Sequence, residues 1–174
     1  QVYLIGEDAV LGIWRADMVE ALRAMSPGVV RFGGSTIEAF EWENAIGPWD
    51  TRVPFTTVWG GLEPNFASVE EFVQLCQHIK AEPLVCIRWT GKTPAAAAAQ
   101  VEYFNGGPET VWGKVRAKNG HPRPYGVKLW QIGNEVGGGQ YDDSVRAFAE
   151  AMRKVDPTIK VLSSYPSAET LARG

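Results

Sequence analysis

Apolar residues follow two alternating patterns along the chain, one typical of helices and one typical of buried strands. Segments with apolar residues at every third or fourth position alternate with short continuous apolar runs. The first pattern predicts helices over 13–25, 68–79, 93–103 and 142–154, and the second predicts strands over 29–32, 83–89, 127–132 and 159–165. The strand expected before the first helix is absent or reduced to residues 2–5.

Local signals support two of the predicted helix starts. Ser68 is a favoured N-cap residue, and Glu71 three positions later completes a capping box. Thr93 followed by Pro94 is typical of an N-cap and a first helical position. Two long polar segments between the elements are predicted to be loops, 35–65 and 105–124.

Alternating helices and strands predict an α/β fold with a parallel sheet. An open doubly wound sheet usually carries a glycine-rich phosphate turn after an early strand, and Gly33-Gly34 lacks the required G-x-G-x-x-G spacing. Polar residues instead follow each strand, which is where barrel enzymes place their chemistry. The sequence therefore favours a (β/α)8 barrel.

Only part of such a barrel is expected in this chain. Eight βα units need about 250 residues, whereas this sequence has 174 residues and about four units. We therefore expect residues 1–174 to form one partial barrel domain that lacks the C-terminal half. Because such a half exposes sheet edges and an apolar face, we expect it to need the remainder of the barrel or a self-associated copy.

Composition narrows the classes of function. Apolar residues make up 45% and charged residues 21% of the chain, values that are typical of globular proteins. A formal net charge of −3 gives no basic surface for nucleic acid, and no apolar run approaches the ~18 residues that a membrane span needs. Cys76 and Cys86 are expected to be buried free thiols.

Asn134 and Glu135 form an unusual end to the predicted strand at 127–132, because both residue types are poor strand formers. At the end of a buried strand, a carboxyl group is well placed for proton transfer. The simpler interpretation is a strand followed by a polar turn.

The chain is also rich in tryptophan, with seven residues. Five of them fall at or beyond the ends of predicted elements: Trp42, Trp49, Trp59, Trp89 and Trp112. Such residues serve either as flat platforms for sugar rings or as ordinary hydrophobic packing. Both interpretations stay open at this point.

A series of motifs runs in order from about Ile13 to Tyr165. The most specific are Trp-Glu-Asn-Ala-Ile-Gly-Pro at 42–48 and the Gly-Asn-Glu strand ending at 133–135. Others are Arg-Phe-Gly-Gly at 31–34, Glu-Pro-Asn-Phe at 63–66 and Trp-Gln-Ile at 130–132. Together they resemble family 51 of the glycoside hydrolases, the α-L-arabinofuranosidases and relatives in a large clan of retaining glycosidases.

The resemblance implies a role for individual residues. Glu135 corresponds to the general acid/base, Asn134 to the amide that binds the sugar hydroxyl next to the anomeric carbon, and Trp59 to a residue beside the sugar cleft. Ser35 stands where the family commonly has a sugar-binding Asn, with one residue missing just before it.

Retaining hydrolysis uses two carboxylates about 5–5.5 Å apart and needs no cofactor. The family's nucleophile lies on the seventh strand, and no residue of this sequence corresponds to it. Three nearby acids are expected to be loop or rim residues instead: Glu38, Glu41 and Glu43. No metal site is expected, because His78 and His121 are far apart and neither has a carboxylate cluster around it.

Three functions remain open. The first is part of a retaining α-L-arabinofuranosidase acting on plant cell-wall polysaccharide, with the nucleophile outside this sequence. The second is another glycosidase of the same clan, a β-glucanase or β-xylosidase. The third is a non-catalytic carbohydrate-binding or truncated protein.

Overall fold

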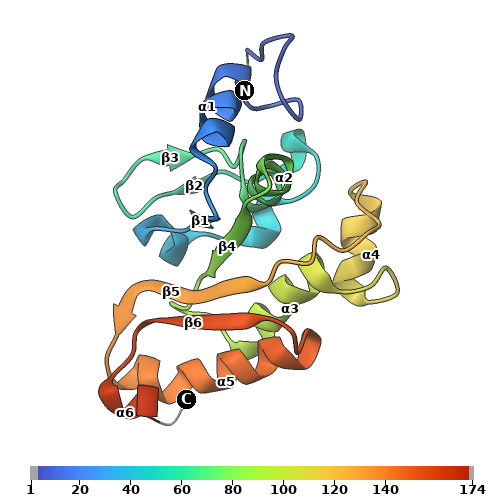
Figure 1. Ribbon diagram of the computed structural model, residues 1–174. Coiled ribbons are helices and arrows are strands. Elements are labelled where there is room, and N and C mark those ends of the chain that lie inside the picture. Colours follow the sequence, from blue (N-terminus) through green and yellow to red (C-terminus); the bar gives the residue numbers. More distant parts are fainter. Residues whose placement is uncertain (1–3, 173–174) are drawn as a thin grey trace.

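A parallel four-stranded sheet is the centre of the computed structural model, which describes residues 4–172 (Figure 1). Its strands are β1 (Val29–Phe32), β4 (Glu82–Ile87), β5 (Leu129–Gly137) and β6 (Lys160–Tyr165). The helices are α1 (Ala16–Met25), α2 (Val69–Ile79), α3 (Pro94–Asn105), α4 (Val111–Lys118), α5 (Gly139–Val155) and α6 (Ala168–Ala172). Between β1 and α2 lie the 3₁₀ helices η1 (Ser35–Ala39), η2 (Trp42–Ala45) and η3 (Trp49–Thr51) and a hairpin of β2 (Phe55–Thr56) and β3 (Leu62–Glu63).

The strands lie in the sheet in the same order as in the chain, β1-β4-β5-β6, and each neighbouring pair is parallel. A doubly wound sheet reverses its strand order at a switch point, whereas a barrel does not. The predicted class, a section of a (β/α)8 barrel with about four βα units, is confirmed.

One face of the sheet carries the core. Phe32, Val85, Trp130 and Val161 are successive register partners, so their side chains share this face. They pack with apolar residues of α2, α3 and α5, and Trp130 is fully buried.

The other face of the sheet is more open. Arg31, Leu84, Leu129 and Lys160 are register partners on this face, and none of them is fully buried. Leu162, one step further along β6, is 41% exposed. In a barrel this face lines the interior, where the remaining strands would cover it.

The predicted helix starts at Ser68 and Thr93 are confirmed. Glu71 Oε2 accepts a hydrogen bond from the backbone N–H of Ser68 at 3.0 Å, and Thr93 Oγ1 accepts one from Ala96 N at 3.2 Å. Both contacts satisfy backbone groups that a helix end leaves unpaired.

One helix start and two loops were predicted wrongly. The first helix begins at Ala16 and not at residue 13, because the preceding residues form an isolated bridge between Val10 and Trp14. The predicted loop 105–124 contains helix α4. Arg116 of this helix is fully buried and donates to the Tyr103 carbonyl at 2.6 Å, which anchors α4 to α3. The predicted loop 35–65 contains the 3₁₀ helices and the hairpin.

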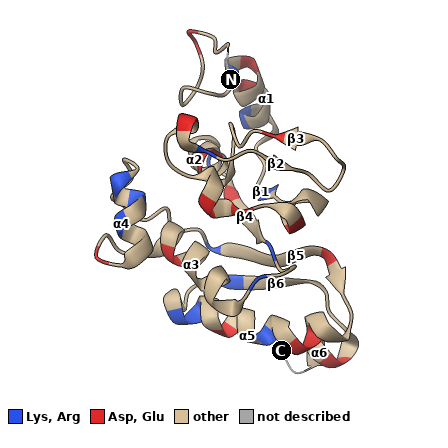
Figure 2. Ribbon diagram, turned by 180° about the vertical axis from the view of Figure 1, so that it is seen from behind, with Lys and Arg blue, Asp and Glu red and all other residues tan. Residues whose placement is uncertain are grey.

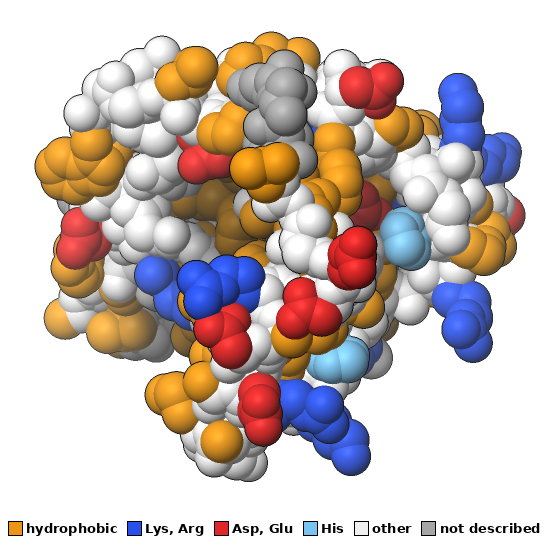
Figure 3. Space-filling view, turned by 90° about the horizontal axis from the view of Figure 1, so that it is seen from above, with side chains coloured by type: hydrophobic (Ala, Val, Ile, Leu, Met, Phe, Trp, Pro, Cys, Tyr) orange, Lys and Arg blue, Asp and Glu red, His pale blue; other side chains and the backbone are white. Residues whose placement is uncertain are grey.

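At the N-terminus, the reduced strand predicted over 2–5 is not found in the described part. Residues 2 and 3 lie outside the described residues, and Leu4 and Ile5 belong to no strand. Leu4, Met18 and Met25 are exposed, and hydrophobic side chains are visible on the face of the molecule that carries α1 (Figure 3). None of the helices that the structure describes is long and apolar enough to cross a membrane.

Three of the five tryptophans belong to the packing of the fold. Trp42 is only 4% exposed, and its ring lies 4.7 Å from that of Trp112. Trp89 packs edge-on against Tyr141. Trp49 and Trp59 remain exposed, so they alone of these five are free to act as surface platforms.

Both cysteines are free and buried, as predicted. Burial raises the pKa of each thiol to about 11, which keeps both protonated and unreactive near neutral pH.

Acidic and basic residues are interspersed over the ribbon, with several basic residues on α4 (Figure 2).

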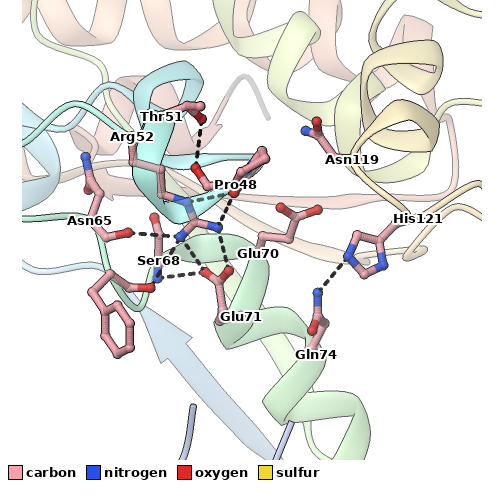
Figure 4. A network of polar contacts seen from close by, with 12 residues as sticks. Pro48, Thr51, Arg52, Asn65, Ser68, Glu70, Glu71, Gln74, Asn119 and His121 are labelled. Carbon is pink, nitrogen blue, oxygen red and sulfur yellow. Dashed lines mark hydrogen bonds and ion pairs between the residues drawn. The ribbon is translucent and has the colours of Figure 1, made fainter. Parts of the chain in front are cut away.

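A buried ion pair fastens the long β1–α2 connection to the start of α2 (Figure 4). The Arg52 guanidinium donates to both oxygens of the Glu71 carboxylate, at 2.6 and 3.0 Å. It also donates to the carbonyls of Gly47 and Asn65, both at 2.9 Å. One side chain therefore ties three separate parts of the connection together.

We predict that Arg52→Met lowers the free energy of unfolding by about 3–5 kcal/mol, because it leaves the Glu71 carboxylate buried without its cation. Arg15→Met, which breaks the exposed pair with Asp17, should leave stability nearly unchanged. Urea denaturation of both variants measures the difference. Equal losses in the two variants would contradict the role given to Arg52.

Candidate active site

The carboxyl end of β5 departs from regular strand geometry. Ile132 pairs with Ser163, and the next pair joins Gly137 to Tyr165. Four residues of β5 therefore lie opposite a single residue of β6, Ser164. Such a bulge bends the strand and redirects its side chains.

Two residues of this bulge have left-handed backbone conformations, Gly133 with φ 70° and Glu135 with φ 53°. A Cβ atom on Gly133 would lie 2.3 Å from Val136 Cγ2, so the bend requires glycine there. Glu135 adopts a conformation that costs a residue with a side chain about 1–2 kcal/mol. Strain of this kind is often found at functional sites.

The bend brings two consecutive side chains to one place. In a regular strand, neighbouring side chains point to opposite faces. Here the Ser35 hydroxyl donates to Glu135 Oε2 at 3.2 Å, and Asn134 Nδ2 approaches the same hydroxyl oxygen at 3.5 Å. Three of the predicted site residues, Ser35, Asn134 and Glu135, therefore lie together at the carboxyl end of the sheet.

Arg31 fixes the orientation of the Asn134 amide. Its Nη2 donates to Asn134 Oδ1 at 2.5 Å, and its Nε donates to Gln131 Oε1 at 3.1 Å. Because a guanidinium can only donate, the amide oxygen must face Arg31 and the NH₂ group faces Ser35. In the sequence, Arg31 appeared only within the Arg-Phe-Gly-Gly motif at 31–34, and nothing linked it to Asn134.

The backbone of the bulge is tied on both sides. On the β4 side, Glu38 Oε1 accepts from Asn134 N at 2.8 Å. On the β6 side, Val136 N donates to Ser164 Oγ at 3.1 Å. The Tyr141 hydroxyl accepts from Ser164 N at 2.7 Å and donates to the Ile132 carbonyl at 2.8 Å.

Tyr141 is suited to this structural role. It is fully buried, and burial raises the pKa of its phenol to about 12. The phenol therefore stays neutral throughout the physiological pH range and continues to donate its hydrogen bond to the Ile132 carbonyl.

Two of the three other acids near this end of the sheet have structural partners. Glu41 forms ion pairs with Arg88, at 2.6 Å, and with Lys92. Both oxygens of Glu38 accept backbone N–H groups, from Thr90 and from Asn134. The third acid, Glu43, has one oxygen, Oε2, that is buried without a hydrogen-bond partner among the described residues. These contacts give Glu38 and Glu41 structural partners and leave neither as a free second carboxylate.

Trp59 lies in the turn of the β2–β3 hairpin and is 80% exposed. The hairpin is on the same side of the molecule as the carboxyl ends of β5 and β6 (Figure 1). A cleft of about 270 Å³ opens between β1, η1 and this hairpin, floored by Phe32, Phe40 and Phe55. Trp59 is not among its lining residues, so its place beside a bound sugar stays a prediction.

Within residues 4–172, no group of three or more His, Cys, Asp or Glu side chains is arranged to hold a metal ion. His78 is exposed on α2. His121 Nε2 lies 3.3 Å from Gln74 Nε2 (Figure 4).

A barrel-type sheet whose strand end presents an amide and a carboxylate side by side is typical of a barrel glycosidase. Comparison with known proteins is consistent with this class. Residues 21–173 match the model of the family described as Alpha-L-arabinofuranosidase 1 domain. The chain belongs to this family, and its resemblance to family 51 is confirmed.

Two curated relatives illustrate the similarity. The chain is 34% identical over 160 residues to the probable α-L-arabinofuranosidase C of Aspergillus clavatus, covering 86% of this chain and 32% of that protein. It is 25% identical over 169 residues to the intracellular exo-α-(1→5)-L-arabinofuranosidase of Acetivibrio thermocellus, covering 91% and 34%. The chain thus spans about a third of the length of these relatives.

Solved structures agree with the fold. The α-L-arabinofuranosidase from Thermotoga maritima, in its arabinose complex, matches with a TM-score of 0.81 and 34% identity, covering 93% of this chain and 37% of that one. The family 51 enzyme from Bifidobacterium longum matches with a TM-score of 0.86 and 26% identity, covering 92% and 34%. These relatives are glycoside hydrolases, and the chain corresponds to part of their barrel.

We predict that Gly133→Ala destabilises the protein more than Gly126→Ala. Both glycines have left-handed backbones, with φ 70° and 71°, so each alanine costs about 1–2 kcal/mol in backbone strain. Only at position 133 does the new methyl group meet another side chain, since Gly126 has open space around its Cα. Urea denaturation compares the two, and equal losses would show that the bulge accommodates a methyl group.

Proposed function

We propose that this chain supplies the acid/base side of the active site of a retaining α-L-arabinofuranosidase that acts on plant cell-wall polysaccharide. One observation carries the proposal: the bent end of β5 places Asn134 and Glu135 on the same hydroxyl, Ser35 Oγ. A plain polar turn would not need a glycine with no room for a Cβ or a glutamate with a positive φ.

Glu135 is the general acid/base in this proposal. Its side chain is exposed, so a glycosidic oxygen can reach the carboxyl group. As an acid it protonates the leaving oxygen, and as a carboxylate it later takes a proton from the water that hydrolyses the covalent intermediate. Ser35 Oγ, which contacts the carboxylate at 3.2 Å, restrains its orientation before substrate binds.

Asn134 is the sugar-positioning residue. It is only 7% exposed, and its oxygen is held by Arg31, so its NH₂ group, which faces Ser35, is the part left to bind a sugar. A donor fixed in this way suits the sugar 2-hydroxyl, whose hydrogen bonds strengthen in the transition state. Ser35 stands where the resemblance leads us to expect Asn. It therefore presents a hydroxyl on a shorter side chain, beside Asn134 and Glu135, in place of an amide.

The nucleophile must come from outside the described residues in this proposal. Retention needs a second carboxylate about 5–5.5 Å from the first, whereas Glu38 is bonded to backbone N–H groups and Glu41 is paired with Arg88 and Lys92. The open face of the sheet, with Arg31 and Leu162 on it, leaves room for further barrel strands to bring that carboxylate. The length of the relatives supports the same arrangement.

We predict that Glu135→Gln in the natural full-length protein lowers kcat for α-L-arabinofuranosides by about 10²–10⁴-fold, the range that general acid–base catalysis contributes. The loss in kcat/KM, which reports the first step, should be larger for arabinan than for 4-nitrophenyl α-L-arabinofuranoside, because nitrophenolate leaves without needing a proton. Initial rates on both substrates measure this difference.

Glu150→Gln serves as the matched control, since Glu150 is an exposed acid on α5 and should leave both rates unchanged. Hydrolysis of β-xylosides or β-glucans in place of arabinofuranosides would favour another glycosidase of the clan. Sugar binding without turnover would favour a non-catalytic carbohydrate-binding protein. Full activity in Glu135→Gln would remove Glu135 from the mechanism.

A further inference from the structure

Glu38 occupies a position that the proposed chemistry does not use. It lies on the short 3₁₀ helix η1, three residues after Ser35. Residues three apart on a 3₁₀ helix lie on the same side, because the helix has three residues per turn. One turn of η1 therefore contacts the end of β5 twice, through Ser35 at the Glu135 carboxylate and through Glu38 at the Asn134 backbone.

The Glu38 carboxylate bridges the ends of two neighbouring strands. Oε1 accepts the backbone N–H of Asn134 at 2.8 Å, and Oε2 accepts the backbone N–H of Thr90 at 2.9 Å. The β4–β5 pairing ends with Ile87 and Ile132, so these two N–H groups lie beyond the ladder. Within the described residues no ladder partner satisfies either group, and one carboxylate here accepts from both.

The same contact explains how the strained bulge is held. The β6 side of the bulge is tied through Ser164 and Tyr141. On the β4 side, Glu38 binds Asn134 N, which lies between the two left-handed residues Gly133 and Glu135. Hydrogen bonds from N–H groups to a charged acceptor are stronger than neutral ones, so this tie is well suited to hold a strained segment.

We propose that Glu38 is a positioning residue for the candidate acid/base: its carboxylate clamps the end of β5 to the end of β4 and so sets where Asn134 and Glu135 point. This proposal rests on the proposed function for the role of Glu135, but the clamp itself can be tested separately. Glu38 does not touch substrate in this scheme, because both of its oxygens are occupied by backbone groups.

The test is Glu38→Gln in the natural full-length protein. Glutamine offers one acceptor and one NH₂ group to two N–H donors, so one of the two bonds is lost. We expect kcat on 4-nitrophenyl α-L-arabinofuranoside to fall by about 10²-fold, the cost of misplacing a catalytic group by about 1 Å, with KM nearly unchanged. Glu38→Ala, which removes both acceptors, should lower kcat further.

A control variant and two spectroscopic measurements separate a positioning role of Glu38 from a general loss of stability. Gly126→Ala strains the backbone in the α4–β5 connection, away from this clamp, and should leave kcat intact at a comparable stability. Amide hydrogen exchange at Thr90 or Asn134 should accelerate, and the Asn134 side-chain NH₂ resonances should shift, in Glu38→Gln but not in Gly126→Ala.

The outcomes distinguish the two proposals. If the wild-type protein hydrolyses no glycoside, the proposed function fails, and the exchange rates and Asn134 resonances still decide whether Glu38 holds the strand ends. Unchanged exchange and unchanged resonances in Glu38→Gln would overturn the clamp. An equal loss of kcat in Gly126→Ala would show that Glu38 acts only through stability.

Discussion

The bend at the end of β5 is the constraint on which the candidate site depends. A regular strand separates consecutive side chains onto opposite faces, whereas this site has Asn134 and Glu135 on the same hydroxyl. Two left-handed residues and a bulge of the β5–β6 pairing remove that separation. The bend exposes backbone groups and stores strain, so it persists only because side chains from η1, α5 and β6 satisfy those groups.

The barrel-type sheet determines where these supports come from. All four strands run in the same direction, so their carboxyl ends meet at one edge and the connections that follow them converge there. The connection after β1 supplies Ser35 and Glu38, and the helix after β5 supplies Tyr141. The Arg52–Glu71 pair anchors the β1–α2 connection to α2. At the other end of the connection, Ser35 and Glu38 hold η1 against the end of β5.

Much of the fold could be predicted because its signals are local. The helix starts at Ser68 and Thr93 depend on residues within three positions, and the strands depend on short apolar runs. Helix α4 was missed because its main anchor is tertiary: Arg116 is buried and bonds the Tyr103 carbonyl. The same limit affected Trp42, for which the sequence left open a sugar platform or hydrophobic packing, and which packs against Trp112 in the core.

The candidate site likewise contains residues that local sequence indicates and residues that only tertiary contacts reveal. Asn134 and Glu135 are adjacent, and a strand pattern points to them directly. Arg31 and Glu38 reach them from about a hundred positions away in the chain, through contacts that no local pattern encodes. The distant pair nevertheless sets the geometry of the adjacent pair. Arg31 can only donate, so it holds the Asn134 oxygen and turns the NH₂ group toward Ser35, and Glu38 accepts the backbone N–H of Asn134. The local sequence therefore indicates the candidate residues, while their orientation depends on charged side chains that only the folded sheet brings close.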